Sequence, residues 1–299
     1  MMPTLTIYTP TYNRAMLLPR VYESLCRQTC KDFFWLVIDD GSTDNTRELV
    51  QSWINEKKIE IEYVYKENGG VHTARDLAYK ICNTELITGC DSDDWLTDNA
   101  VEWWLKCWET RMPGEYAGIL SVTVDEHGVR VTGEFPKMEA LSYQDFTYKY
   151  GCSGEKDSVF CKKVVAMLPD YPVYPGEKLV GEDYKWIQFP DDIPFLLLDR
   201  VTRVYEQQSD GYIKGVALSR FKNPNGFRAS AKQHIINSKY LKPRLKGHLS
   251  YIAFSIILKD KRYIKDSPKP LISLLLTPFG FAVYLRFLYQ KKRVDHAGK

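Results

Sequence analysis

Three carboxylates within four positions form the stretch of this sequence that is best suited to chemistry. Asp91, Asp93 and Asp94 follow an apolar run that ends at Cys90. Carboxylates this close repel one another, so the cluster should raise its own pKa values or bind a cation. Mg²⁺ and Mn²⁺ accept oxygen ligands, and Mg²⁺ is commonly held by one or two carboxylates plus substrate phosphates. The Asp-x-Asp spacing therefore indicates a metal-diphosphate site.

A second interpretation of the same cluster needs no ligand. Carboxylates are common in solvated turns before a helix, and Asp98 or Thr97 would then serve as the N-cap residue. A short motif does not decide between the two interpretations by itself. The choice between a metal site and a solvated turn depends on the secondary-structure elements that position the cluster.

Those elements are predicted to alternate between strands and helices. Continuous apolar runs, typical of strands buried on both faces, are each followed by a polar loop and a segment of helical periodicity. This alternation predicts a doubly wound α/β domain. The predicted strands are 5–9, 33–38, 59–65 and 86–90, and the predicted helices are 17–28, one ending near Asn55, 71–81 and the Trp-rich 97–111.

The loops that follow the four strands carry the unusual residues. They span 9–14, 39–44, 68–75 and 91–94. Ligands in open α/β sheets bind outside the carboxyl ends of the strands, so the four loops should converge on one crevice. This convergence favours a ligand site over a set of independent turns, although Asp-Gly-Ser and Asn-Gly-Gly are common turn sequences.

The same loops resemble those of the family 2 glycosyltransferases, which have the GT-A nucleotide-diphospho-sugar transferase fold. The resemblance covers residues 4–110, and a looser similarity to bacterial enzymes of capsule and surface polysaccharide synthesis continues to Tyr205-Glu206. It implies a Rossmann-like mixed sheet flanked by helices. The motifs that carry it are Thr9-Pro10-Thr11-Tyr12-Asn13-Arg14, Asp39-Asp40-Gly41-Ser42-Thr43-Asp44, Asn68-Gly69-Gly70 with Ala74-Arg75, and Asp91-Ser92-Asp93-Asp94.

The resemblance also implies a division of the chain and roles for its residues. The catalytic domain would be 1–212, with a nucleotide-binding half (1–110) and an acceptor half (111–212). In the donor site, Thr9 and Tyr12 would contact the base and ribose, and Asp39 or Asp40 would accept from the uracil imide N–H. Arg75 would bind the diphosphate, and Asp91 and Asp93 would hold the ribose and Mg²⁺ or Mn²⁺. The residues expected beside them are Arg14, Asn68, Gly69, Gly70 and Ser92. Strand-end packing for Thr9 and Tyr12, and a surface charge for Arg75, remain the alternatives.

A second chemical stretch contains Glu182 and Asp183 at the start of a predicted helix. Transfer of a sugar to an alcohol needs a base for the hydroxyl proton, and carboxylates can serve as that base. In the family the base lies at this place, so Asp183 is the expected base and Glu182 the alternate. Carboxylates are also favoured at helix N-termini for electrostatic reasons alone. The polar segment 207–212 would cover the donor as a lid or form a plain surface loop.

Charge is distributed unevenly along the chain. Residues 1–212 carry 22 Lys and Arg against 35 Asp and Glu (−13), whereas residues 213–299 carry 19 against 3 (+16). The C-terminal part is predicted to be helical over 227–258, and Leu271–Leu285 is an uncharged stretch that contains Pro278. A spanning helix needs about 20 apolar residues, so an in-plane helix on anionic lipid fits better, with packing on the α/β domain as the alternative. Nucleic acid is not expected, because the acidic catalytic part would repel it.

The remaining features concern compartment and rival functions. Seven cysteines without a Cys-x-x-Cys pair favour free thiols, and the N-terminus lacks a signal peptide, so we expect a cytoplasmic protein at the inner membrane face. The expected activity is inverting transfer, of the hexosyltransferase class, from a UDP-sugar to a lipid-linked saccharide. The rivals are a sugar-phosphate nucleotidyltransferase, a receiver-like signalling module and a catalytically silent partner protein. Donor sugar, linkage and oligomeric state are not predicted.

Overall fold

The chain divides into two compact units. The computed structural model describes residues 3–206 and 212–297, of which 3–169 and 189–206 form unit 1 and 170–188 and 212–297 form unit 2. Residues 170–188 thus group with the C-terminal helices by their contacts. The functional division at residue 212 remains a prediction, and residues 207–211 of the predicted lid lie outside the described residues.

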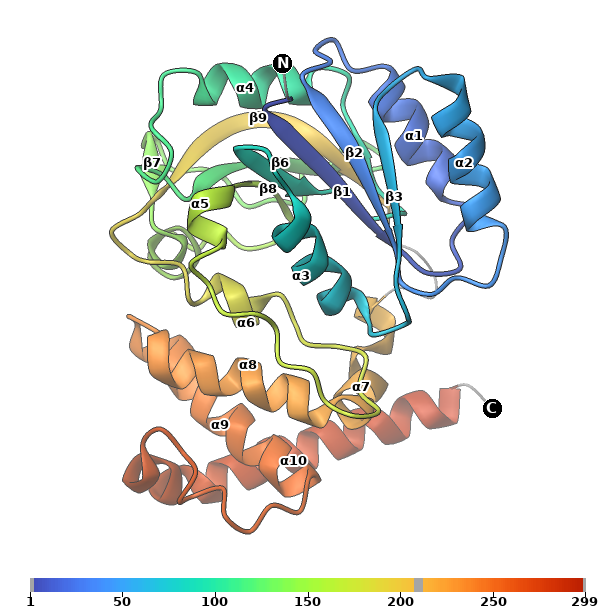
Figure 1. Ribbon diagram of the computed structural model, residues 1–299. Helices are drawn as coiled ribbons and strands as arrows, with labels where there is room; N and C mark the ends of the chain where they lie inside the picture. The colour runs from blue at the N-terminus through green and yellow to red at the C-terminus, as the bar shows by residue number, and fades with distance from the viewer. Residues whose placement is uncertain (1–2, 207–211, 298–299) are drawn as a thin grey trace. The chain divides into compact units, whose positions relative to one another are not determined.

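Four parallel strands form one half of the sheet of unit 1 (Figure 1). They are β1 (Leu5–Thr11), β2 (Phe33–Asp39), β3 (Ile61–Tyr65) and β4 (Leu86–Gly89), in the order β3-β2-β1-β4. Every residue of β1 is buried, as a strand covered on both faces requires. The prediction of an α/β domain with these strands is confirmed.

The other half of the sheet is mixed. β8 (Lys156–Cys161) runs antiparallel to both β4 and β6 (Gly118–Asp125), and β6 runs parallel to β9 (Phe195–Tyr205). Two short strands, β5 (Trp95–Leu96) and β7 (Ala140–Leu141), pair antiparallel with β9. Residues 129–133, which follow β6, form only an isolated bridge, from Arg130 to Val124.

Helices cover both faces of the parallel strands (Figure 1). Trp35 of β2 stacks with Tyr22 of α1 (Leu18–Cys26) and lies near Trp53 of α2 (Thr46–Glu56). Tyr8, which faces the opposite side of the sheet from Trp35 by register, meets Tyr79 of α3 (Val71–Ile81). The bounds of α3 match the prediction, because its helical periodicity is uninterrupted.

The remaining elements of unit 1 are short. Helix α4 (Ala100–Trp108) begins at the N-cap Asn99, so neither Asp98 nor Thr97 takes that position. Trp104 and Trp108 are buried, so the aromatic side chains at these two positions serve packing. A π-helix (Asp145–Lys149) and α5 (Lys162–Val165) complete the unit.

Unit 2 is helical. It contains α6 (Asp183–Trp186), α7 (Tyr212–Lys222), α8 (Pro224–Asn237), α9 (Leu241–Ile257) and α10 (Pro270–Ala297). The predicted helical region 227–258 is therefore two helices, separated where Ser238 and Tyr240 adopt extended backbone.

A carboxylate holds the segment 170–188 to α8. Glu177 Oε1 accepts from the backbone N–H of Asn225 at 3.0 Å, and Glu177 Oε2 accepts from the N–H of Gly226 at 2.9 Å. These N–H groups belong to the first turn of α8, where no partner exists within the helix and a negative charge is favoured. The contact fixes the segment that carries Glu182 and Asp183 within unit 2.

Candidate active site

The four loops at the carboxyl ends of the parallel strands are joined to one another. The Asn13 side chain, after β1, accepts from the N–H of Thr43 after β2 at 2.7 Å. Asp40, after β2, binds the loop after β3, and Arg14 pairs with Asp93 after β4. The predicted convergence of these loops is confirmed by the contacts. Neighbouring parallel strands place their following loops side by side, so the sheet order dictates the arrangement.

Asp40 organises the loop after β3. Its carboxylate accepts from the N–H groups of Gly69 and Gly70 at 2.9 and 2.8 Å, from Asn68 Nδ2 at 3.2 Å and from Lys66 Nζ. A carboxylate has about four acceptor positions, so these donors use them all. Asp40 is therefore poorly placed to accept from a nucleobase. Gly69 and Gly70 were expected beside the donor, but their N–H groups are committed to this carboxylate.

Asp39 keeps acceptor capacity. It accepts from the Ser42 N–H at 2.7 Å through one oxygen and from the Tyr63 hydroxyl at 2.5 Å through the other. Burial, together with the hydrogen bond to Asp39, raises the pKa of Tyr63 to about 12, so this phenol stays a donor at neutral pH. Because two acceptor positions remain, Asp39 is the better of the two aspartates for an imide N–H.

Thr9 and Tyr12 differ in their surroundings. Thr9 is fully buried, and its hydroxyl accepts from Trp35 Nε1 at 2.9 Å. Its side chain serves packing, which is the alternative we considered for it, and we do not retain it as a nucleotide contact. Tyr12 lies just beyond the end of β1 and is 48% exposed, so its ring is accessible to a base.

Two arginines neutralise the acidic loop. Arg14 Nη1 lies 3.0 Å from Asp93 Oδ2, and Arg75 Nη2 of α3 lies 3.5 Å from Asp91 Oδ1. Burial, followed by the charge of Asp91, raises the pKa of Asp93, and Arg14 opposes the shift. Guanidinium groups match phosphates as well as carboxylates. Arg14 and Arg75 are thus placed to exchange their carboxylate partners for a diphosphate.

The acidic loop suits a cation whose coordination is completed by oxygen atoms of a substrate. Among residues 3–206 and 212–297, no three His, Cys, Asp or Glu side chains are grouped to hold a metal ion. Mg²⁺ commonly uses one or two carboxylates plus phosphate oxygens, so the pair Asp91 and Asp93 fits this requirement. Burial and, after it, the charge of Asp91 raise the pKa of Asp93, and a bound ion would offset the repulsion between the two carboxylates. Ser92, between the two aspartates, is buried and shapes the loop.

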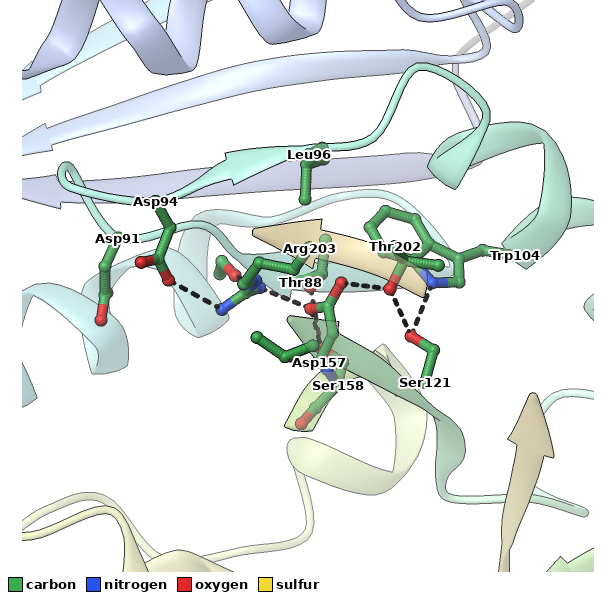
Figure 2. Close-up of polar contacts among 12 residues, drawn as sticks. Thr88, Asp91, Asp94, Leu96, Trp104, Ser121, Asp157, Ser158, Thr202 and Arg203 are labelled. Atoms are coloured by element: carbon green, nitrogen blue, oxygen red, sulfur yellow. Dashed lines mark hydrogen bonds and ion pairs between the residues drawn. The ribbon is translucent and has the colours of Figure 1, made fainter. Parts of the chain in front are cut away.

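A buried polar network, which sequence reasoning missed, supports the acidic loop (Figure 2). Arg203 of β9 donates to Asp157 of β8 at 2.5 Å and to the carbonyl of Gly89 at the end of β4, and its Nη1 lies 3.7 Å from Asp94. Burial raises the pKa of Asp94 well above its usual value, an effect that Arg203 counteracts. The guanidinium therefore ties the end of β4 and the acidic loop to two other strands.

The network continues into the core. Asp157 is fully buried and accepts from the Thr202 hydroxyl at 2.7 Å. The Thr202 and Ser121 hydroxyls lie 2.7 Å apart, and Trp104 Nε1 donates to Ser121 at 3.1 Å (Figure 2). A charged residue inside a strand is costly unless it is paired. Asp157 within the run Lys156–Cys161 was the signal in the sequence that could have indicated such a pair.

The expected base lies in unit 2. Asp183 is the first residue of α6, its side chain is 51% exposed, and its Oδ2 lies 3.2 Å from His234 Nε2 of α8. Glu182, just before it, is also exposed. An imidazole beside a carboxylate restricts its orientation, so His234 is placed to position Asp183. The sequence did not indicate His234, because nothing in the local pattern links residues 183 and 234.

The fold defines a class. A mixed sheet flanked by helices, whose parallel strands end in polar loops, is the architecture of the GT-A nucleotide-diphospho-sugar transferases. Over 98% of this chain and 83% of the other, the fold is similar to that of S. aureus TarS residues 1–349 in complex with UDP-GlcNAc (TM-score 0.60, 16% identity). It is also similar to that of the mannosyltransferase PcManGT from Pyrobaculum calidifontis in complex with GDP-Man and Mn²⁺ (TM-score 0.53, 17% identity, 99% and 85% covered).

Sequence comparison finds a family model that matches the first part of the chain. Residues 6–152, just under half of the chain, match Glycosyl transferase family 2. It is 42% identical over 94 residues to validoxylamine A glucosyltransferase from Streptomyces hygroscopicus subsp. jinggangensis, which is 30% of this chain and 22% of the relative. It is 35% identical over 101 residues to chondroitin synthase from Escherichia coli, which is 33% of this chain and 14% of the relative. The chain thus spans about a fifth or less of the length of these relatives.

Proposed function

We propose that this protein transfers a sugar from a nucleotide diphosphate donor, a UDP-sugar, to an acceptor hydroxyl with inversion at the anomeric carbon. The observation that carries the proposal is the pairing of Asp93 and Asp91 with Arg14 and Arg75 at the carboxyl edge of the sheet. Such an arrangement offers oxygen ligands for a divalent ion and guanidinium groups for a diphosphate within one loop cluster.

On the donor side, each residue has a distinct task. Tyr12 packs against the base, and Asp39 accepts from the imide N–H. Arg14 and Arg75 bind the diphosphate, and Asp93 and Asp91 would hold Mg²⁺ or Mn²⁺. The bound ion would stabilise the negative charge that develops on the leaving nucleoside diphosphate.

On the acceptor side, Asp183 removes the proton from the attacking hydroxyl. The acceptor oxygen forms a bond to the anomeric carbon while the bond to the diphosphate oxygen breaks, and the proton passes to the Asp183 carboxylate. His234 positions that carboxylate through the 3.2 Å contact. Glu182 is the alternate base.

The acceptor follows from the family resemblance and from the relatives. We propose a lipid-linked saccharide at the cytoplasmic membrane face, in the synthesis of a capsule or other bacterial surface polysaccharide. The similarity to a chondroitin synthase, a protein named for a polysaccharide product, supports this proposal. The hydroxyl and the linkage are not assigned.

Calorimetric titration tests the donor site. We expect the full chain to bind UDP in the presence of Mn²⁺, with affinity at least about tenfold weaker after EDTA, because the ion joins the acid pair to the diphosphate. UDP should bind more tightly than GDP or ADP, because Asp39 would select the imide edge. Preference for another nucleotide would refute the UDP assignment. Absence of binding to every nucleotide diphosphate would refute the proposed function.

A charge-neutral substitution tests the base. We expect Asp183→Asn to lower kcat/KM for transfer by roughly 10²- to 10⁴-fold while leaving the dissociation constant for UDP unchanged, because the amide cannot accept the proton. Glu182→Gln is the matched control and should stay within about threefold of the wild type. The opposite pattern would make Glu182 the base, and full activity in both variants would place the base elsewhere.

A further inference from the structure

Helix α10 has two faces of different character, and the inner face packs against α9 within unit 2. Gly280 approaches α9 so closely that an added Cβ would lie 2.5 Å from Ile252 Cγ2. The Phe287 and Phe254 rings lie 5.4 Å apart. The Ser273 hydroxyl lies 3.1 Å from Nδ1 of His248. These contacts fix the rotation of α10 about its axis.

The outer face is apolar and exposed. It presents a row of large apolar side chains along the first two thirds of the helix, each 45% to 77% exposed. Single exposed apolar residues are ordinary on protein surfaces, but a continuous row indicates an interaction site. The residues are Leu271, Ile272, Leu274, Leu275, Phe279, Phe281, Leu285 and Tyr289.

Cations extend this row. Arg286, Lys292 and Arg293 are exposed and continue the outer face at helical spacing beyond Leu285. Residues 213–299 as a whole carry 19 Lys and Arg against 3 Asp and Glu. An apolar face flanked by cations is characteristic of helices that lie in the interface of an anionic membrane. A second copy of this surface would meet strong repulsion, which disfavours self-association through the same face.

The packing of α10 favours a helix that lies in the plane of a membrane over one that spans it. By its length and composition, Pro270–Asp295 is long and apolar enough to cross a membrane. Crossing would require α10 to leave α9 and lose the contacts of Ser273 and of Thr277, whose hydroxyl lies 3.0 Å from that of Tyr263. It would also carry Arg286 toward the hydrocarbon core, at high cost. Lying in the plane keeps the inner contacts and buries the outer row.

We propose that the outer face of α10 docks the protein on an anionic lipid surface, with the apolar row at the level of the acyl boundary and the three cations on headgroup phosphates. This role is independent of the donor nucleotide. It assigns the uncharged stretch of the C-terminal region to peripheral attachment.

Vesicle flotation of the full chain tests the proposal. We expect the wild type to float with vesicles of phosphatidylcholine and 30% phosphatidylglycerol in about 0.1 M salt, and to bind pure phosphatidylcholine at least about tenfold more weakly, because the cations contribute only on anionic lipid. The double variant L275E/F279E should lose at least about tenfold in binding. The triple variant R286Q/K292Q/R293Q should lose roughly 100-fold on anionic vesicles.

The matched control is I236E/L241E, which changes two exposed apolar residues elsewhere in unit 2. It should bind as the wild type does, and all variants should keep the wild-type circular dichroism spectrum and melting temperature. Equal flotation of L275E/F279E and the control would overturn the proposal. Failure of the wild type to float would also overturn it. A wild-type dimer that L275E/F279E converts to monomer without a change in flotation would instead make the outer face a self-association surface. Protein in cell membranes that resists extraction at high salt and alkaline pH would instead make α10 a spanning helix.

Discussion

Substitution of Asp93 by Asn is expected to reduce sugar transfer by at least about 10³-fold while leaving the fold intact. The amide lacks the charge that balances Arg14, whose Nη1 lies 3.0 Å from the carboxylate, and that would hold the divalent ion in the proposed function. Loss of that ion would remove the main stabilisation of the charge on the leaving diphosphate, an effect of several kcal/mol on the transition state. Steady-state kinetics with excess Mn²⁺ measures the effect.

Asp98→Asn is the matched control for this experiment. Asp98 is a nearby carboxylate whose side chain is 55% exposed and which pairs with Arg27 instead of with a residue of the acidic loop. We expect that variant to transfer sugar at a rate within about twofold of the wild type, since surface ion pairs contribute little. Unchanged transfer in Asp93→Asn would remove Asp93 from the metal site.

Substitution of Arg203 by Met is expected to destabilise unit 1 by about 3–5 kcal/mol, since it leaves Asp157 as a fully buried carboxylate without its cation. The melting temperature should fall by roughly 10 °C for a domain of this size. Thermal unfolding followed by circular dichroism measures the shift. Because Arg203 also contacts the Gly89 carbonyl and lies near Asp94, the acidic loop should lose its fixed position and transfer should fall as well.

Two further variants test this explanation. Arg200→Met removes another arginine of β9, an exposed one that stacks over Trp103, and should change the melting temperature by no more than about 3 °C. The double variant R203M/D157N removes both charges and should recover much of the stability lost in R203M. Equal melting temperatures of R203M and R200M would show that the buried pair does not stabilise the domain.

Local pattern was sufficient for residues 1–110, the proposed nucleotide-binding half. The parallel strands and α3 were predicted from continuous apolar runs and helical periodicity, which depend on neighbouring residues only. The convergence of the four loops followed from a general property of parallel sheets and needed no coordinates. The acid pair was recognisable because Asp91 and Asp93 lie two positions apart in the sequence.

The residues that were predicted to form the donor site show where local pattern fails. Thr9 and Tyr12 both lie near the end of β1, yet only the structure shows that Thr9 faces Trp35 and Tyr12 is exposed. Asp39 and Asp40 are adjacent in the sequence, but their side chains have different partners. Asp39 accepts a hydrogen bond from the Tyr63 hydroxyl, whereas Asp40 accepts from the N–H of Gly70 in the loop after β3. The choice depends on which side chains from other strands arrive beside each residue.

By itself, then, the sequence determined the α/β class of the domain, the order of its first elements, the convergence of the loops proposed as the donor site and the cationic character of the C-terminal part. Tertiary structure alone decided which strands enter the sheet between β4 and β9, and it brought Arg203 to Asp157 and Gly89, 46 and 114 positions away. It also decided which face of α10 is left exposed. Short-range order follows from periodicity that can be read along the chain, whereas burial of a charge or an apolar face depends on partners that only folding brings together.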